Sequence, residues 1–409
     1  MSSQQRPARR NGQPRIPLIL FGAFDRHNFG DLLLGRIAAR TTGRADAIAA
    51  GLAARELRRA GGFAVAALDD IVAAQAGHAF DLLQVGGEIL GCSRYEAAVM
   101  LLAPDEAARI VARLDRDTAA RDHWAVGQPG TARELPYVAS RGALPGVRRI
   151  LHAGIGAVEL ETLPAMLRDT ALARLRDADR IWVRDAMRQD ALMRTGLHSR
   201  LAPDPATLVA RLFSARIARW SNGAGMAALR ARFPQGYLAL QFSADFGDDE
   251  TLRQLANGVE TFAAARRLGI VAFCAGRAPW HDAPAIHRRL RYFLADPARL
   301  VSSPARSLWA LCALIAESSA VCASSLHARI VGEAFARPVV TLLRTPRAGR
   351  KQSAYARTWD PDGLNPLARP EMAEAALAGA SRVDPAQRTR HARQLADRAA
   401  EAWQWLLSP

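Results

Sequence analysis

Short apolar runs alternate with longer amphipathic segments along most of the chain. Residues 16–23 form an apolar run that a proline opens and a glycine closes, which predicts a buried strand, and a helix is expected to begin at Asp31. Further strands are predicted at 80–87, 148–156 and 178–185. Because strands that alternate with helices form parallel sheets covered on both faces, this half of the chain predicts an α/β domain.

The strand–helix series restarts after an irregular stretch at 212–225. One helix of the second series is expected to have Ser303 as its N-cap and Pro304 as its first residue. The strands of this series are predicted at 236–245, 270–276, 320–324 and 337–343.

These patterns divide the chain into a first α/β domain at 16–215 and a second at 235–370. Residues 384–407 predict a long helix that packs back across both domains, with an apolar stripe through Leu395, Ala399, Trp403 and Leu406. Residues 1–15 are basic but lack an apolar core, so they are interpreted as a flexible arm and not as a secretory signal.

The composition fits a folded chain with anionic partners. Half of the 409 residues are hydrophobic, which is enough for two domains with cores of their own. The net charge is +16 and arginine dominates it, since Lys351 is the only lysine. This charge favours phosphorylated metabolites or lipid head groups. A nucleic-acid partner is not expected, because the basic residues are dispersed and form no aromatic-studded patch.

The cysteines and the most apolar stretch indicate the compartment. Cys92, Cys274, Cys312 and Cys322 are scattered, without zinc spacing, so no metal site is predicted and they are interpreted as reduced core residues. The apolar stretch at 308–326 is broken by a glutamate and a serine pair and is not expected to span a membrane. We therefore expect a cytoplasmic protein, with peripheral contact to the anionic inner face of a membrane.

Ligands of open α/β sheets bind at the carboxyl ends of the strands, so the residues there are candidates for a site. Each candidate also fits an ordinary helix cap or turn, and the pattern alone leaves both interpretations open. They are Asn28, Gly30 and Asp31 after the first strand, Gly86 and Gly87 after the second, Arg184 and Asp185 after another, and Asp204 between two prolines.

The stretch CASSLHARIVGEAFARPVV, at 322–340, adds a histidine. Ser324 and Ser325 fall at the start of a predicted helix, and His327 lies on its first turn. The free N–H groups and partial positive charge of a helix N-terminus suit a phosphate or carboxylate. A histidine within so apolar a run also fits a packed core residue, so both interpretations stand at this point.

Five segments together resemble the polysaccharide pyruvyl transferase family. That family has N-x-G-D after its first strand, a glycine-rich turn, an R-D pair before a helix, a D-P pair, and R-L-H followed by an apolar helix and G-x-P. The matching segments span about 16–345 and are GAFDRHNFGDLLL, DLLQVGGEIL, IWVRDAMRQDAL, APDPATL and CASSLHARIVGEAFARPVV.

The resemblance implies a GT-B-like fold, with two Rossmann-like domains that face each other across the active site. It implies transfer of the pyruvyl group of phosphoenolpyruvate onto two hydroxyls of a saccharide, giving a cyclic pyruvate ketal during exopolysaccharide or cell-envelope biosynthesis. No cofactor is implied, since phosphoenolpyruvate is the donor substrate. The acceptor, free or lipid-linked, is expected on the side of 16–215 and the donor on the side of 235–370.

The resemblance also implies roles for residues. His327 matches the family's general acid, and either Asp31 or Asp204 is expected to act as base or to orient a hydroxyl. A donor with a phosphate and a carboxylate predicts a net positive cleft, with Arg184 and an arginine from Arg277, Arg344 or Arg347 directed into it. The remaining substrate-binding candidates are Asn28, Gly30, Gly86, Gly87, Asp185, Ser324 and Ser325.

The chain departs from the family pattern at two positions. Glu88 stands where the third glycine of the turn is expected, and Ser325 stands where the family has an arginine before Leu-His. Two other functions therefore stay open. One is a GT-B glycosyltransferase that uses a nucleotide sugar, in which Glu333 would hold a ribose hydroxyl. The other is a degenerate family member that binds saccharides without catalysis.

Overall fold

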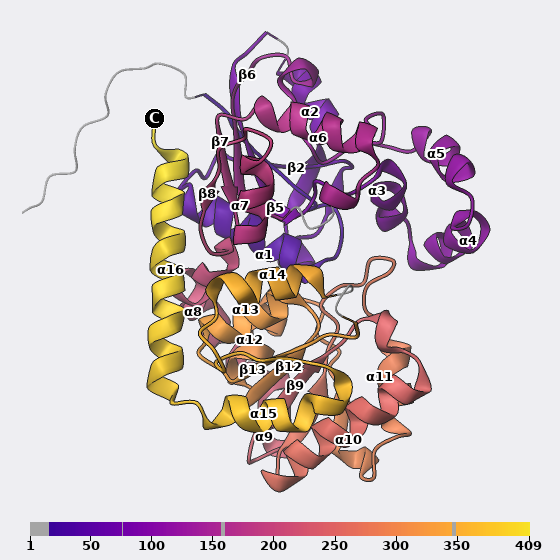
Figure 1. Ribbon diagram of the computed structural model, residues 1–409, viewed down its shortest axis with the longest axis vertical. Helices are drawn as coiled ribbons and strands as arrows, with labels where there is room; N and C mark the ends of the chain where they lie inside the picture. The colour runs from indigo at the N-terminus through magenta and orange to yellow at the C-terminus, as the bar shows by residue number, and fades with distance from the viewer. Residues whose placement is uncertain (1–15, 76, 157–159, 346–348) are drawn as a thin grey trace, which may run out of the picture.

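The computed structural model describes residues 16–75, 77–156, 160–345 and 349–409, which form two α/β domains stacked along the long axis of the molecule (Figure 1). The predicted basic arm at 1–15 lies outside the described residues, and so does Arg347. The expected fold class is confirmed: each domain is a predominantly parallel sheet flanked by helices on both sides.

The first domain is an eight-stranded sheet in the order β3-β4-β2-β1-β5-β6-β7-β8, parallel except between β3 and β4. Its strands are β1 (Leu18–Phe21), β2 (Ile48–Gly51), β3 (Arg55–Glu56), β4 (Ala64–Ala67), β5 (Phe80–Glu88), β6 (Val147–Gly156), β7 (Arg180–Val183) and β8 (Arg200–Leu201). Its helices are α1 (Phe29–Thr41), α2 (Leu68–Ala74), α3 (Arg94–Leu101), α4 (Pro104–Leu114), α5 (Thr118–Val126), α6 (Ala165–Arg176), α7 (Ala186–Met193), α8 (Val209–Ser221) and α9 (Ala224–Arg232).

The second domain is a six-stranded parallel sheet in the order β11-β10-β9-β12-β13-β14. Its strands are β9 (Tyr237–Gln241), β10 (Gly269–Ala272), β11 (Leu300–Ser302), β12 (Ala320–Ala323), β13 (Val339–Leu342) and β14 (Leu367–Ala368). Its helices are α10 (Asp249–Ala265), α11 (Pro284–Arg291), α12 (Leu308–Glu317), α13 (Leu326–Ala334), α14 (Arg350–Trp359) and α15 (Ala373–Arg382), followed by α16 (Pro385–Leu407).

Both sheets reverse their strand order beside the first strand, which is the Rossmann arrangement. The reversal lies between β1 and β5 in the first domain and between β9 and β12 in the second. Crossovers leave in opposite directions at such a point, so a crevice opens outside the carboxyl ends of the two strands. The topology therefore places one crevice in each domain.

Some elements differ from the sequence prediction. The strands β2, β3 and β4 were not predicted, because alanine and glycine dominate two of them and give little hydrophobic contrast. The prediction that Ser303 caps a helix is wrong: α12 begins at Leu308 after Ser307. Ser303 instead follows β11, where its backbone N–H donates to Ala272 and its hydroxyl accepts from the N–H of Ala305.

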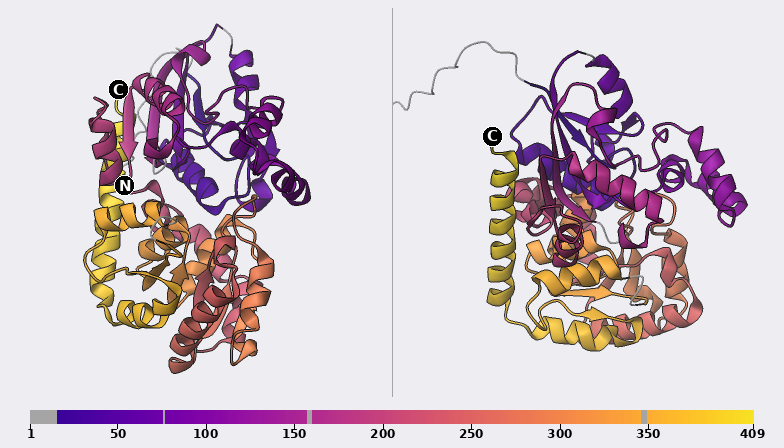
Figure 2. Two further views of the ribbon diagram at one scale, coloured as in Figure 1. Left: turned by 45° about the vertical axis from the view of Figure 1, so that its right-hand side comes forward. Right: turned by 45° about the horizontal axis from the view of Figure 1, so that its top comes forward.

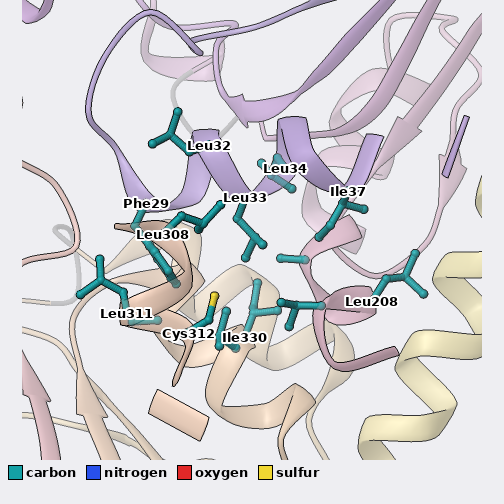
Figure 3. Packing of buried hydrophobic residues seen from close by; sticks show 14 of the residues in the cluster. Phe29, Leu32, Leu33, Leu34, Ile37, Leu208, Leu308, Leu311, Cys312 and Ile330 are labelled. Carbon is teal, nitrogen blue, oxygen red and sulfur yellow. The ribbon is translucent and has the colours of Figure 1, made fainter. Parts of the chain in front are cut away.

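The two domains share one hydrophobic core across their boundary. On α1, Leu33 and Ile37 face Leu311 and Cys312 of α12 and Ile330 of α13, and Figure 3 shows these side chains pointing toward one another. All five are essentially inaccessible to solvent. The interface is therefore packed like the interior of one domain.

Helix α16 bridges the domains, as predicted, and runs along both of them in Figures 1 and 2. Trp403 packs edge-on against Trp182 of β7, with ring centroids 5.5 Å apart. At the other end of the helix, the Arg388 guanidinium donates to the carbonyl of Ala336 at 3.1 Å. Its N-cap is Asp384, one residue before Pro385.

Two further observations concern the cysteines and the apolar helices. All four cysteines are free and buried. Within the described part of the chain, no helix is long and apolar enough to cross a lipid bilayer.

Candidate active site between the domains

A polar cavity of about 290 Å³ lies between the domains, where the two topological crevices face each other. It receives Asn28 and Asp31 from beyond β1, and Gly87 and Glu88 from the end of β5. The second domain contributes Gln241 at the end of β9 and three residues of the turn into α13, namely Ser324, Ser325 and His327. Both domains thus supply the side chains that a ligand there would meet.

Asn28 caps α1 and joins the two domains. Its side-chain oxygen accepts from the N–H groups of Gly30, at 2.9 Å, and Asp31, at 3.3 Å. Its amide nitrogen lies 2.9 Å from Nε2 of His281, so the amide donates and Nε2 accepts. Nδ1 of His281 then donates to the carbonyl of Pro279 at 2.9 Å. This pair of bonds fixes His281 as the neutral Nδ1–H tautomer. Burial also favours the neutral form, because it lowers the pKa of His281.

Gly30 provides the space for His327. A Cβ atom at position 30 would lie 2.0 Å from Nδ1 of His327, a contact that no side chain tolerates. The absence of a side chain on α1 therefore lets an imidazole from α13 approach the start of the first-domain helix.

His327 faces a carboxylate of the opposite domain. Its Nε2 lies 3.6 Å from Oδ2 of Asp204, slightly beyond hydrogen-bond range, and its side chain is 14% exposed. Asp204 is fully buried and caps the turn at 205–208 by accepting from the N–H of Ala206. Burial alone would raise the pKa of Asp204, but His327 and Arg184 lower it to about 2. Asp204 is therefore ionised throughout the neutral range.

Arg184 connects Asp204 to Glu88. Its guanidinium donates to Asp204 at 3.0 Å and to Glu88 at 2.5 Å, and the side chain is only 2% exposed. Although Arg184 borders the cavity, both of its bonded carboxylates compete with any anionic ligand for its charge. Gly156 gives the pair its space, because a Cβ atom there would lie 2.1 Å from Glu88.

The start of α13 is well capped. The hydroxyl of Ser325 accepts from the N–H of Ala328, and the N–H of Ser325 itself donates to Gln241 at 2.8 Å. Ser324 accepts from the N–H of Ser243 and its carbonyl accepts from Gln352. The predicted N-cap is thus present and lies at the cavity.

Asp31 presents its carboxylate beside the glycine turn. One oxygen accepts from the Arg26 guanidinium at 3.3 Å, and the other lies 3.0 Å from the place of a Cβ at Gly87. Gly87 has a φ of +92°, a backbone conformation that side chains other than glycine rarely adopt. Gly86 precedes it and does not border the cavity.

Like Gly86, five other candidates lie outside the cavity lining, and one of them is Gly30, which lies against His327. Asp185 caps α7 by accepting from the N–H of Arg188. Glu333 is buried in α13, where it accepts from Arg329 at 2.7 Å. Arg277 contacts the first domain through its backbone N–H, which donates to the carbonyl of His27. Asp204, described above, reaches the cavity only through His327 and Arg184.

The predicted net positive cleft is wrong for the described lining residues. Arg184 and Arg344 border the cavity as expected, but the lining is formally balanced. Two acids that sequence reasoning did not single out, Asp245 and Asp282, join Asp31 and Glu88 in offsetting the cations. The lining contains four cations, Arg26, Arg184, Arg344 and Lys351, and four acids, Asp31, Glu88, Asp245 and Asp282.

Sequence reasoning also missed several residues that line the cavity. Trp280, His281 and Asp282 come from the loop after β10, and Lys351 from the start of α14. The signal available for Lys351 was its status as the only lysine of an arginine-rich chain. Across the described residues, no group of three or more histidine, cysteine, aspartate or glutamate side chains is arranged to hold a metal ion.

Comparison with known families supports the resemblance seen in the motifs. Residues 154–345 match the family described as polysaccharide pyruvyl transferase, so the resemblance is confirmed over that segment. The segment contains Arg184, Asp204 and His327, while the N-x-G-D loop and the glycine turn precede it. No curated protein matches the chain in sequence.

Solved structures with the same fold include sugar-nucleotide enzymes of the GT-B class. The UDP-GlcNAc 2-epimerase of Methanocaldococcus jannaschii aligns over 93% of this chain and 99% of its own, with 10% identity and a TM-score of 0.55. The UDP-GlcNAc 2-epimerase of Neisseria meningitidis, bound to UDP-GlcNAc, aligns over 96% of this chain and 99% of its own, with 11% identity and a TM-score of 0.52. A UDP-forming α,α-trehalose-phosphate synthase from Burkholderia xenovorans, in complex with glucose-6-phosphate, aligns over 95% of this chain and 98% of its own, with 13% identity and a TM-score of 0.53. At these identities the likeness shows the fold alone.

Proposed function

We propose that the protein transfers the pyruvyl group of phosphoenolpyruvate onto two hydroxyls of a saccharide and releases phosphate. The family match over 154–345 supports a transferase of this class. The observation that carries the proposal is the pairing of His327 with Asp204 at 3.6 Å across the domain boundary, beside a polar cavity.

The reaction needs a proton at one carbon and a hydroxyl at the next. The methylene carbon of phosphoenolpyruvate gains a proton, and the first saccharide hydroxyl attacks the adjacent carbon as it becomes electron-poor. The bond from this carbon to the phosphate oxygen then breaks, and the second hydroxyl closes the ketal. One hydroxyl proton balances the proton on the new methyl group, and the other leaves with phosphate.

His327 is the proposed acid. The ionised carboxylate of Asp204 faces Nε2 and stabilises the imidazolium, so the proton to be delivered is carried on Nδ1. Nδ1 lies against the backbone of Gly30, where a side chain would occupy its place. Asp204 thereby acts as a positioning residue, since it is buried behind the histidine and does not border the cavity.

Asp31 is the proposed base or hydroxyl-orienting group. It is the carboxylate of the N-x-G-D loop and borders the cavity from the first domain. Arg26 holds one of its oxygens, which leaves the oxygen beside Gly87 to accept a hydroxyl proton. In this proposal the reacting hydroxyl of the acceptor lies beside Asp31 of the first domain, the side that the resemblance implies.

The donor anion is proposed to lie at the start of α13. Ser325 and Ser324 form that helix end, and Lys351 borders the same cavity with an ammonium group that can pair with phosphate or carboxylate. Arg344 adds a second cation, although Asp248 accepts from it at 3.2 Å. These groups would take the place of the arginine that the family has at position 325.

Two competing functions define the experiment. The GT-B neighbours act on nucleotide sugars, which favours a glycosyltransferase, and the capture of Arg184 by Glu88 favours a saccharide-binding protein without turnover. Phosphate release should be measured with phosphoenolpyruvate and a panel of methyl hexopyranosides, with mass spectrometry for the ketal, in parallel with UDP release from UDP-GlcNAc. Ketal formation with phosphate release supports the proposal. UDP release, or binding of glycosides without any turnover, would replace it with the corresponding alternative.

The proposed donor is a cytoplasmic metabolite, so the proposed reaction belongs in that compartment. A lipid-linked acceptor would be reached at the inner face of the membrane, to which the net charge of +16 is suited.

A further inference from the structure

Trp280 is a large aromatic side chain left open to solvent at a polar cavity. It lies in the loop between β10 and α11, borders the cavity beside His281, and is 44% exposed. Its neighbours in the lining are mostly charged or polar. An exposed aromatic group among convergent polar groups is a common feature of ligand sites.

The backbone holds Trp280 in a conformation that bulky residues rarely adopt. Its φ is +63°, in the left-handed region, where most residues other than glycine are strained. Asp282 fixes the loop, because its carboxylate accepts from the N–H of Ala275 at 2.5 Å and from Gln241 at 2.8 Å. The strain is therefore maintained by a well-bonded loop, which sets the direction of the ring.

The ring is also supported from the other domain. Tyr95 of α3 lies behind it, with ring centroids 6.0 Å apart and planes inclined by 53°. Tyr95 in turn packs edge-on against Trp124 of α5 at 5.9 Å. The helices α3, α4 and α5 form a projection from the first domain in Figure 1. Trp280 thus lies at the junction between this projection and the second domain.

Trp280 is connected to the proposed acid through a short series of contacts. His281, the next residue, accepts from Asn28, and Asn28 caps the helix turn that carries Gly30. Gly30 in turn lies against His327. Trp280 and His327 therefore border one cavity, and the start of α1 contacts both His281 and His327.

We infer that Trp280 is the stacking platform for the saccharide acceptor, an assignment that rests on the proposed function. A hexopyranose has a face of C–H bonds and a rim of hydroxyls, which matches an indole face set among hydrogen-bonding side chains. The negative face of an aromatic ring attracts polarised C–H groups and disfavours anions. Phosphoenolpyruvate, a small anion, is therefore the less suitable ligand for this ring, and the sugar the more suitable one.

Trp220 offers a matched control. It is 43% exposed on α8 and does not border the cavity. The wild type, Trp280→Ala, Trp280→Phe and Trp220→Ala should be titrated with methyl β-D-galactopyranoside, methyl β-D-glucopyranoside and methyl α-D-mannopyranoside. Binding is followed by intrinsic tryptophan fluorescence and by calorimetry, and KM values for the glycoside and for phosphoenolpyruvate are measured separately.

The expected result separates the two substrates. Trp280→Ala should weaken glycoside binding, or raise its KM, by about 10-fold or more, since an aromatic contact of this size is lost. Trp280→Phe should retain part of the affinity, and Trp220→Ala all of it. The KM for phosphoenolpyruvate should change less than about twofold, because the donor does not contact the ring.

Three results would overturn the inference. These are an unchanged glycoside affinity in Trp280→Ala, no glycoside binding by the wild type up to the solubility limit, or a Trp280-dependent response to UDP in place of glycosides. Failure of the proposed function looks different. Trp280-dependent glycoside binding without phosphate release from phosphoenolpyruvate would contradict the proposed transfer reaction and support the role of Trp280. Normal transfer by Trp280→Ala would support the reaction and contradict the role of Trp280.

Discussion

The imidazole of His327 lies against the backbone of Gly30, although the two residues belong to different domains. The ring occupies the space that a side chain at position 30 would fill, with Nδ1 at 2.0 Å from the missing Cβ. A helix start in one domain thus sets the position of a histidine in the other, and the placement of the candidate acid depends on how the domains pack.

Gly30→Ala tests this placement. The added methyl group would displace the imidazole by an ångström or more, and a misplacement of that size lowers the catalytic rate by about 10²-fold. Phosphate release and thermal unfolding should be measured together. Gly379→Ala is the control, since Gly379 lies in α15 with no atom within 4 Å of an added Cβ, and it should leave activity unchanged. Full activity in Gly30→Ala would show that the position of His327 is not critical.

His327→Ala should inactivate the protein without unfolding it. The side chain borders the cavity and its Nε2 has no hydrogen-bond partner among the described residues, whereas the loss of a general acid typically costs about 10²–10⁴-fold in rate. The measurements are phosphate release and the free energy of unfolding. Strong destabilisation with near-normal turnover would make the histidine structural.

Asp204→Asn should act through His327. The amide cannot stabilise an imidazolium, so the rate should fall in the wild-type background and change little further in the His327→Ala background. A double-mutant cycle on the rate measures this coupling. Additive effects would indicate that Asp204 serves only its partner Arg184.

Lys351 can be tested by its chemistry, because it is the only lysine of the chain. Acetylation with an amine-selective reagent should modify it within the cavity, and phosphoenolpyruvate should slow that modification. Lys351→Met should raise the KM for phosphoenolpyruvate about 10-fold to 100-fold, as expected for the loss of a charge-assisted hydrogen bond. Lys351→Arg keeps the charge and should keep most of the affinity. Equal labelling rates with and without phosphoenolpyruvate would contradict the donor site.

His152 should make the fold sensitive to acid. It is buried in β6, where neither ring nitrogen has a hydrogen-bond partner among the described residues, and burial lowers its pKa to about 4. In the unfolded chain a histidine takes up its proton near pH 6.5. Above that pH the protonation of this group does not change the free energy of unfolding, and as the pH falls from 6.5 to 4 the unfolded state gains on the order of 3 kcal/mol from this residue.

His152→Leu removes that cost. Denaturant unfolding at pH 7 and pH 4.5 should show a smaller loss of stability on acidification than in the wild type, with no loss at pH 7. The exposed His198 is the control, and His198→Leu should leave the acid sensitivity as it is. An identical loss in His152→Leu and wild type would mean that other groups cause it.

The parts of the fold that sequence could predict are those set by local patterns. Fully buried strands such as β9 and β12 consist almost entirely of apolar residues, so their sequences could be recognised as strands. The caps of α1 and α13 were predictable because asparagine and serine satisfy free N–H groups within three residues. His327 followed from its place after such a cap.

The remaining features of the site depend on contacts between distant segments. Trp280 and Asp282 lie on an irregular loop, and only the docking of that loop on Asn28 and Gln241 brings them to the cavity. The balanced charge of the lining has the same origin, since Glu88 reaches Arg184 over 96 positions of sequence. No periodicity encodes such pairs.

The core shared by α1, α12 and α13 has a genetic consequence. A gene split between α9 and β9 would yield two fragments, one exposing Leu33 and Ile37 and the other Leu311 and Ile330. Each fragment produced alone would carry a large uncovered apolar face, which favours aggregation. When the two fragments are produced together, each can cover the apolar face of the other. The two halves of this chain are therefore expected to fold only as a pair and not as independent domains.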